Sequence, residues 1–315
     1  MGAASWLDVE PDSPYSIENI PFGIISKSSS SLTPTPAVAI GEYCISLKRL
    51  AEGNAFVEPP DIQPHLEVFT HAKTLNAFAG LGRPLHQSVR LYIRELFLDD
   101  TKYPHLLKDN AKLQNVTIHR LVDCTTHVPM QIGDYTDFYA GLNHAYNIGV
   151  LFRGPQNALP HGQILPQPGD AEPVHAPSRK LDIELELAAF LCKGNGSNGE
   201  PIAIAEAENY IFGYTLMNDW SARDIQAFEY VPLGPFGSKN FATTISSFVV
   251  LADALEPFRC NTMLPTSSHD ALTKCKSVLP YLQEDAGKKS HYNIRLHVDL
   301  KPADQGHANQ QGNGS

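Results

Sequence analysis

The sequence predicts a mainly β protein of the α+β class, and three patterns lead to this prediction. Residues 181–187, Leu-Asp-Ile-Glu-Leu-Glu-Leu, alternate apolar and acidic side chains, which is the period of a half-buried strand. From about Leu113 onward, short apolar runs are separated by Gly-bounded turns and polar loops. Before Leu113, short strands are mixed with helices. Apolar residues make up 42% of the chain, so we expect a sizeable core rather than global disorder.

The first section is expected to contain a hairpin and one long helix. Residues 36–41 and 43–47 predict two strands that turn at Gly41 and Glu42. Apolar side chains recur at helical spacing over 84–99, so we predict an amphipathic helix there, with Pro84 near its first turn. The stretch 26–36, rich in Ser, Thr and Pro, is predicted to be a loop.

The second section is expected to be built mainly of strands. Their predicted ranges are 117–122, 181–191, 211–217, 247–252 and 292–300. A turn is predicted at 194–199, and a short helix at 221–229 with Ser221 near its N-cap. A chain of 315 residues allows about two domains. We place them at 1–115 and 116–301, followed by a disordered polar tail at 302–315.

Composition excludes several classes of protein. No run of about 18 apolar residues is present, so no membrane span is expected. The first residues lack the basic and apolar regions of a secretory signal. The net charge is −10 and the 24 basic residues do not cluster, so nucleic acid is not an expected partner. The five widely spaced cysteines fit neither a zinc site nor a disulfide framework, so we expect a cytoplasmic protein.

The strand at 181–187 carries the first candidate site. Asp182, Glu184 and Glu186 should line one face, with Glu184 and Glu186 roughly 7 Å apart along the strand. Like charges this close repel one another unless solvent or a cation separates them, and paired carboxylates suit a hard divalent ion. A solvated outer face explains the same pattern, and the strand taken alone favours that second interpretation.

Three further segments hold unusual densities of reactive side chains. They are 132–139, followed by Asn143-His144 and 151–154; 217–226, which follows a predicted strand; and 230–244, a Gly/Pro-rich loop with one lysine. Each is weak evidence alone, because a lone His is more often structural than catalytic and Asn-Asp after a strand is often a turn.

Together these segments resemble the fumarylacetoacetase family. The motifs occur in one order: Gly-Asp-Tyr-Thr-Asp-Phe-Tyr, Leu-Asp-Ile-Glu-Leu-Glu, Met-Asn-Asp-Trp-Ser-Ala-Arg-Asp-Ile-Gln and Glu-Tyr-Val-Pro-Leu-Gly-Pro-Phe. Segments 19–23, 38–41 and 75–82 extend the resemblance over nearly the whole chain. It implies an N-terminal SH3-like β-domain, then a mixed β-sandwich roll that is incomplete at the C-terminus, and a homodimer.

The resemblance also implies a reaction. It is the hydrolysis of a carbon–carbon bond in a 1,3-diketo acid, which converts 4-fumarylacetoacetate and water to fumarate and acetoacetate. This is the last step of tyrosine and phenylalanine catabolism. The residue types suit that chemistry, because a divalent ion polarises a β-dicarbonyl group, a neutral His takes a proton from water, and cationic donors stabilise an oxyanion.

The resemblance assigns these tasks to particular residues. It implies a Ca2+ site at Asp137, Glu184, Glu186 and Asp219, and a structural Mg2+ near Asp219, Lys239 and Thr243. The implied catalytic residues are His144 as the base and Arg223, Gln226 and Lys239 as oxyanion donors. The implied substrate contacts are Tyr139, Arg153 and Tyr230.

The sequence departs from the family pattern in three places. A Gly-rich substrate loop is missing after Pro160, the match ends near Leu300, and Ala242 stands where the family usually has Gly. The family's continuation carries a Glu that orients the catalytic His, so we expect the chain as written to hydrolyse fumarylacetoacetate feebly or not at all. Two alternatives remain open: a member with another diketone hydrolase or decarboxylase activity, and a non-catalytic metal-binding paralogue. Turnover of a diketone panel separates the first alternative from a fumarylacetoacetase, and metal binding without any turnover would support the second.

Overall fold

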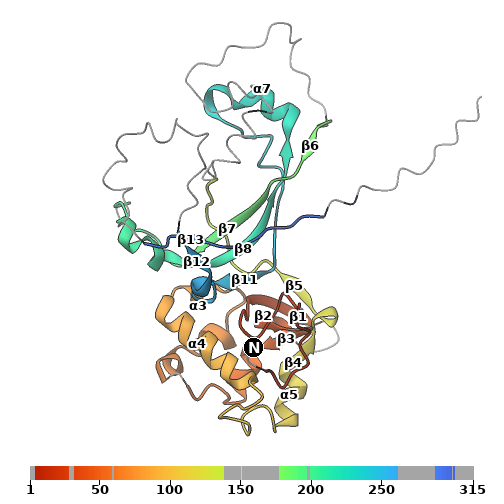
Figure 1. Cartoon of the computed structure of the whole chain (residues 1–315), viewed down its shortest axis with the longest axis vertical. Helices are drawn as coiled ribbons and strands as arrows, with labels where there is room; N and C mark the ends of the chain where they lie inside the picture. The colour runs from red at the N-terminus through yellow and green to blue at the C-terminus, as the bar shows by residue number, and fades with distance from the viewer. Residues whose placement is uncertain are drawn as a thin grey trace, which may run out of the picture.

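The computed structural model describes residues 4–27, 32–58, 60–137, 150, 177–196, 199–261, 288–299 and 301. These residues form a mixed fold around a nine-stranded antiparallel sheet with several helices, as the α+β class predicts. Most of the helices pack with the first strands at one end of the molecule. A long arm made of β7 and β8 carries α7 at the other end (Figure 1).

The strands of the first section are β1 Phe22–Lys27, β2 Leu32–Ile40, β3 Tyr43–Ser46, β4 Ile118–Arg120 and β5 Thr125–His127. The predicted hairpin is confirmed, since Ile40 pairs with Tyr43 and Gly41 turns the chain at φ 57°. The loop predicted at 26–36 is too long at both ends, because β1 continues to Lys27 and β2 starts before residue 36. β2 begins at Leu32 and pairs Pro36 with Ile24, because the fixed φ of proline is compatible with extended backbone.

The helices of the first section are α1 Leu47–Glu52, η1 Pro60–His65, α2 Glu67–Thr70, α3 Asn76–Ala79, α4 Arg83–Phe97, α5 Ala111–Thr117 and η2 Leu121–Asp123. The helix predicted over 84–99 is confirmed as α4, which follows Gly82 at φ 90°. Its face with Val89 and Ile93 is fully buried in a core that also contains Phe22 and Phe78.

The second section begins with β6 Leu181–Asp182, β7 Leu185–Leu191, η4 Ile204–Tyr210, β8 Ile211–Asp219 and β9 Ser221–Ala222. It continues with α7 Arg223–Leu233, β10 Thr243–Ile245, β11 Phe248–Leu251, η5 Ala252–Phe258, β12 Arg259–Cys260 and β13 His291–Tyr292. β8 is central, with β7 on one side and both β10 and β11 on the other. β11 also pairs with β1, so the two sections share one sheet.

Three predicted elements of this section differ from the structure. The strand predicted at 181–191 is interrupted at residues 183–184, because β6 pairs with β9 whereas β7 pairs with β8. The strand predicted at 292–300 extends only over β13, and residues 293–299 pair with no described strand. Ser221 lies in β9 and donates its hydroxyl to the carbonyl of Asp219, so the predicted helix begins at Arg223 instead.

The strand predicted at 117–122 is shorter than expected, since β4 ends at Arg120 and the chain enters η2. β4 pairs with β3, and β5 pairs with β1, so residues beyond 116 contribute to the first section's sheet. The proposed division near residue 116 stays a prediction.

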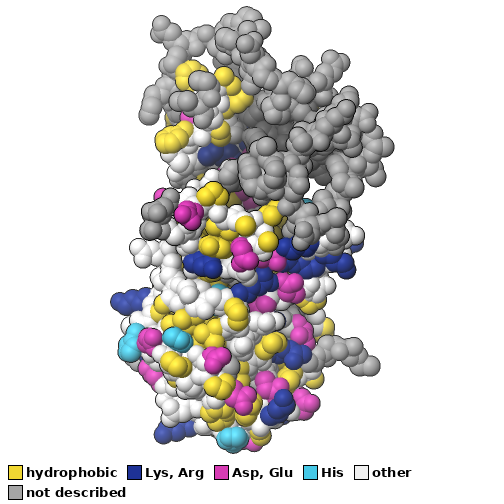
Figure 2. Space-filling model, turned by 90° about the vertical axis from the view of Figure 1, so that its left-hand side faces the viewer, with side chains coloured by type: hydrophobic (Ala, Val, Ile, Leu, Met, Phe, Trp, Pro, Cys, Tyr) yellow, Lys and Arg dark blue, Asp and Glu magenta, His cyan; other side chains and the backbone are white. Residues whose placement is uncertain are grey.

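The surface carries charges of both signs. On the described part of the face in Figure 2, Lys and Arg side chains are interspersed with Asp and Glu, unlike the continuous basic surface typical of nucleic-acid-binding proteins. Charged side chains of the described residues also form ion pairs, such as Arg259 with Glu208 at 2.9 Å. No described helix combines the length and the apolar character that a membrane crossing requires.

Candidate metal centre

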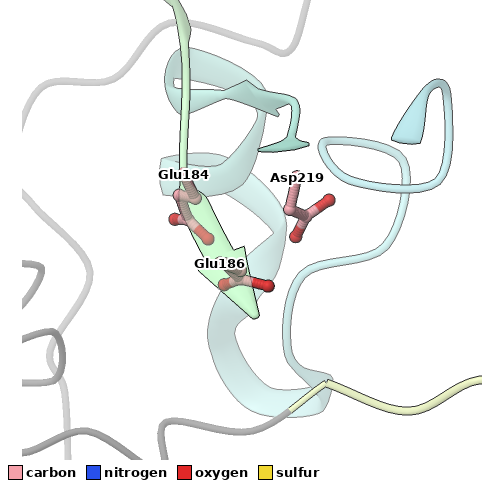
Figure 3. Close-up of side chains that lie close together, drawn as sticks. All are labelled: Glu184, Glu186 and Asp219. Carbon is pink, nitrogen blue, oxygen red and sulfur yellow. The ribbon is translucent and has the colours of Figure 1, made fainter. Parts of the chain in front are cut away.

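Three carboxylates converge where β7 meets the end of β8. Ligand oxygens of Glu184, Glu186 and Asp219 all lie within 4.8 Å of one another (Figure 3). Glu184 and Glu186 are two residues apart on one face, as the alternation predicts. Antiparallel pairing brings Asp219 opposite Glu184, whose carbonyl accepts the amide of Asp219 at 3.0 Å. A side-chain group from a second strand therefore completes the acidic face.

Two buried cations neutralise part of this group. Lys239 Nζ lies 2.5 Å from Glu184 Oε2 and 2.8 Å from Asp219 Oδ2. Arg223 Nη1 lies 2.7 Å from Glu184 Oε1. The Lys239 and Arg223 side chains are 11% and 8% exposed, so solvent screens these contacts only weakly.

A second set of contacts orients Arg223. Its Nε donates to Asp182 Oδ2 at 2.8 Å, and its Nη1 donates to Gln226 Oε1 at 2.9 Å. Arg223 and Gln226 are three residues apart in α7, so they lie on the same side of the helix. The guanidinium is thus held by a carboxylate and an amide besides Glu184.

Charge and donor chemistry fit a divalent cation. Asp182, Glu184, Glu186 and Asp219 carry −4 when ionised, Arg223 and Lys239 carry +2, and the remainder is −2. Asp219 Oδ1 is buried and accepts no hydrogen bond from the described residues. A buried, unpaired carboxylate oxygen in an acidic group is what a Ca2+ or Mg2+ ion would satisfy.

The pKa values of the three carboxylates diverge. Burial, followed by the charges of Asp137, Glu184 and Asp219, raises the pKa of Glu186 to about 7. Burial also raises the pKa of Asp219, although Lys239 partly offsets the effect. Burial opposes ionisation of Glu184 as well, but hydrogen bonds and charge from Lys239 and Arg223 outweigh it and lower its pKa. Glu186 is therefore the carboxylate that lacks enough positive charge.

The other predicted ligands lie around this group. Asp137 is exposed, and its carboxylate lies outside the three-residue cluster, although its charge acts on Glu186. Thr243 is exposed on β10 and pairs directly with Asp219. Tyr230 is half-buried on α7, near the end of the helix that begins with Arg223. The predicted residues Tyr139, His144 and Arg153 lie outside the described part of the chain.

Sequence reasoning missed three contributors to the site. Asp182 was expected only as a third carboxylate on the strand face, whereas it binds Arg223. Asn218 Oδ1 accepts the amide of Glu184 at 3.2 Å. Glu229 lies three residues beyond Gln226 on α7 and binds the loop that carries Lys239. The three-residue spacing of polar side chains along 223–229 is the sequence signal that points to Glu229.

Comparison with known proteins agrees with the motifs. The family model described as Fumarylacetoacetase N-terminal matches residues 18–129, and the model described as Fumarylacetoacetate (FAA) hydrolase C-terminal matches residues 141–309. The chain is 51% identical to fumarylacetoacetase fahA of Aspergillus fumigatus and 50% identical to the fumarylacetoacetase of Emericella nidulans. Both alignments cover 95% of this chain and 74% of the relative.

Plant relatives are also similar. The identity to the fumarylacetoacetase of Arabidopsis thaliana is 40%, over 95% of this chain and 73% of that protein. The two family models together span most of the chain, including both sections of the fold and the acidic group. The chain belongs to the fumarylacetoacetase family.

Proposed function

We propose that the protein is a hydrolase that cleaves 4-fumarylacetoacetate with water to give fumarate and acetoacetate, the last step of tyrosine and phenylalanine catabolism. Relatives named fumarylacetoacetase, at 40–51% identity, support this reaction. The observation that carries it is the pair of buried cations, Arg223 and Lys239, beside an acidic group suited to a divalent ion.

The metals are proposals of the same kind. Ca2+ would be held by Asp137, Glu184, Glu186 and Asp219, which supply carboxylate oxygens. Structural Mg2+ would lie near Asp219, Lys239 and Thr243, with backbone oxygens at the latter two. A bound divalent ion supplies a Lewis acid that polarises the β-dicarbonyl group of the substrate.

Arg223 is well suited to donate to a substrate oxygen. A guanidinium has five N–H donors in a planar fork. The contacts with described residues use Nε and Nη1, which leaves Nη2 for a ligand. Since Asp182 and Gln226 already orient the fork, little reorganisation is needed when negative charge develops on the substrate.

Lys239 can act beside it. Its ammonium has three N–H donors, of which Glu184 and Asp219 occupy two. Among the described residues no acceptor is seen for the third, which can donate to an oxyanion of the substrate. These two carboxylates and their hydrogen bonds raise the pKa of Lys239 even though burial lowers it, so the side chain stays cationic at neutral pH.

The remaining assignments rest on the family resemblance. His144 would be the general base that takes a proton from water, and Tyr139, Arg153 and Tyr230 would contact the diketo acid substrate. An N-terminal SH3-like β-domain, a β-sandwich roll and a homodimer are proposed on the same basis. The cytoplasmic location also rests on the widely spaced cysteines.

The experiment is a product assay. The purified chain is incubated with 4-fumarylacetoacetate, Ca2+ and Mg2+, and both products are quantified by mass spectrometry at high enzyme concentration. We expect the parent chain to form fumarate and acetoacetate above an enzyme-free blank. Both Arg223→Gln and His144→Ala should lose this product formation. The Ca2+ affinity of His144→Ala should stay nearly intact. Product formation that is absent, or unchanged in both variants, would refute the proposed function.

A further inference from the structure

Glu229 receives an unusual number of hydrogen bonds from one short loop. Its Oε1 accepts the backbone amides of Phe236 at 2.6 Å and Ser238 at 2.8 Å, together with the Ser238 hydroxyl at 2.5 Å. Its Oε2 accepts the amide of Gly237 at 2.9 Å. Three consecutive backbone amides and one hydroxyl therefore converge on a single carboxylate.

The loop has a local reason to need this acceptor. The amides of Lys239 and Asn240 donate to the carbonyl of Phe236, which closes one helical turn. The first amides of such a turn have no acceptor within it. Glu229 supplies that acceptor from α7, and Gly237 allows the close approach, because a Cβ there would lie 3.3 Å from Glu229 Oε2.

The same loop connects to both cations of the acidic group. Lys239 follows Ser238 directly and binds Glu184 and Asp219 through Nζ. The Ser238 carbonyl accepts the amide of Ala222 at 2.9 Å, and Ala222 immediately precedes Arg223. Any displacement of residues 236–238 is therefore transmitted to Lys239 and to the start of α7.

The charge of Glu229 supports this arrangement. Partial burial acts to raise the pKa of Glu229, but hydrogen bonds from Ser238, Phe236 and Gly237 outweigh burial and lower it. The carboxylate is thus ionised at neutral pH, and amide hydrogen bonds to an ionised acceptor are stronger than those to a neutral one.

We propose that Glu229 is a positioning residue, whose carboxylate holds the backbone of 236–238 so that the Lys239 ammonium stays in the donor position beside Glu184 and Asp219. Its effect on turnover rests on the proposed function, in which Lys239 stabilises the oxyanion. Its effect on the placement of Lys239 does not depend on catalysis. These two consequences are tested separately.

The first test measures how readily Lys239 reacts with acetic anhydride, by mass spectrometry of the full chain. A buried, ion-paired ammonium reacts slowly, so release of the loop should raise the rate at Lys239 by about tenfold in Glu229→Ala and by a smaller factor in Glu229→Gln. The exposed Lys180 supplies an internal reference, and Glu200→Gln removes the same charge from an exposed position.

The acetylation rate of Lys239 can be measured in either Glu229 variant, so one variant that folds is enough to test the inference. The inference is supported if the acetylation rate rises at Lys239 while the rate at Lys180 stays unchanged, and if Glu200→Gln causes no such rise. An unchanged rate at Lys239 in whichever Glu229 variant keeps its fold would overturn it. If Glu229→Ala does not fold, judged by circular dichroism, Glu229→Gln alone decides, since it retains the side chain's shape.

The second test is a double-mutant cycle on fumarylacetoacetate hydrolysis. If Glu229 acts through Lys239, Glu229→Ala should lower kcat by about tenfold or more in the parent but by less than about twofold in a Lys239→Met background. Equal losses in both backgrounds would show that Glu229 acts elsewhere and would overturn the inference. If the parent chain shows no turnover, the proposed function fails, and the reactivity of Lys239 still decides the positioning.

Discussion

Calcium affinity should fall steeply when the pH drops below about 7, and Glu186 should set that dependence. Its pKa is about 7, because burial and three neighbouring carboxylates oppose its ionisation. A metal ion binds the ionised carboxylate, so below that pH one proton must leave for each ion bound. The affinity should then approach a fall of about tenfold for each pH unit below the pKa, or about 50-fold in all between pH 7 and 5.

The folding stability of the metal-free protein has the opposite pH dependence, because it falls as Glu186 ionises. A carboxyl group whose folded pKa lies above its unfolded value stabilises the fold below the unfolded pKa, and loses that contribution as pH rises through the folded pKa. The contribution of Glu186 should therefore disappear between about pH 4.5 and 7. Calcium restores stability where Glu186 is ionised, so the rise in Tm on adding calcium should be larger at pH 8 than at pH 5.5.

Isothermal titration calorimetry between pH 5 and 8 measures both the affinity and the protons released. We expect about one proton released per calcium ion at pH 6 and little release at pH 8. Glu186→Gln should weaken binding by about tenfold or more at pH 8 and remove most of the slope between pH 6 and 8. An affinity independent of pH in the parent, or an equal slope in Glu186→Gln, would refute this reasoning.

Three further changes have defined outcomes. Glu184→Gln should also weaken calcium binding by about tenfold or more. An unchanged calorimetric Kd would favour the alternative interpretation, in which the acidic face of the strand is only solvated. Gly213→Ala should lower the free energy of unfolding, measured by urea denaturation, by about 1–3 kcal/mol, because the new Cβ would lie 2.4 Å from the Val250 carbonyl. A decrease under about 0.5 kcal/mol would contradict this close approach. Arg90→Met should cost about 3–5 kcal/mol by leaving the buried Asp253 carboxylate without its 2.7 Å partner. The double variant with Asp253→Leu should recover much of that loss, and no recovery would mean that Arg90 acts through other contacts.

Local sequence patterns determined the elements that depend on one face being buried. The apolar spacing over 84–99 predicted α4 to within two residues at each end, because a helix packed on a core repeats its apolar side chains every three or four positions. The turn at Gly41 was equally visible, since few residues adopt its positive φ. The order of motifs identified the family, which the comparisons confirm.

Patterns of this kind did not predict where strands stop. Residues 181–187 alternate without interruption in sequence, yet the strand breaks at 183–184, because β6 and β7 pair with different neighbours. The alternation at 292–298 is as regular, but residues 293–299 have no described strand beside them. A strand needs a partner to satisfy its backbone groups, and the partner is not encoded within the segment.

The sequence by itself predicted that Glu184 and Glu186 share a face, because side chains two residues apart on extended backbone point to the same side. Only the tertiary structure decided what that face meets. Asp219 arrives through the register of β7 and β8, and Lys239 arrives from a loop 55 residues beyond Glu184. Arg223 is aimed by Asp182, and Lys239 is held by the loop that Glu229 binds. Periodicity records which side of a segment is buried, whereas the charge balance and pKa values of a site depend on groups that strand pairing and loop closure bring together.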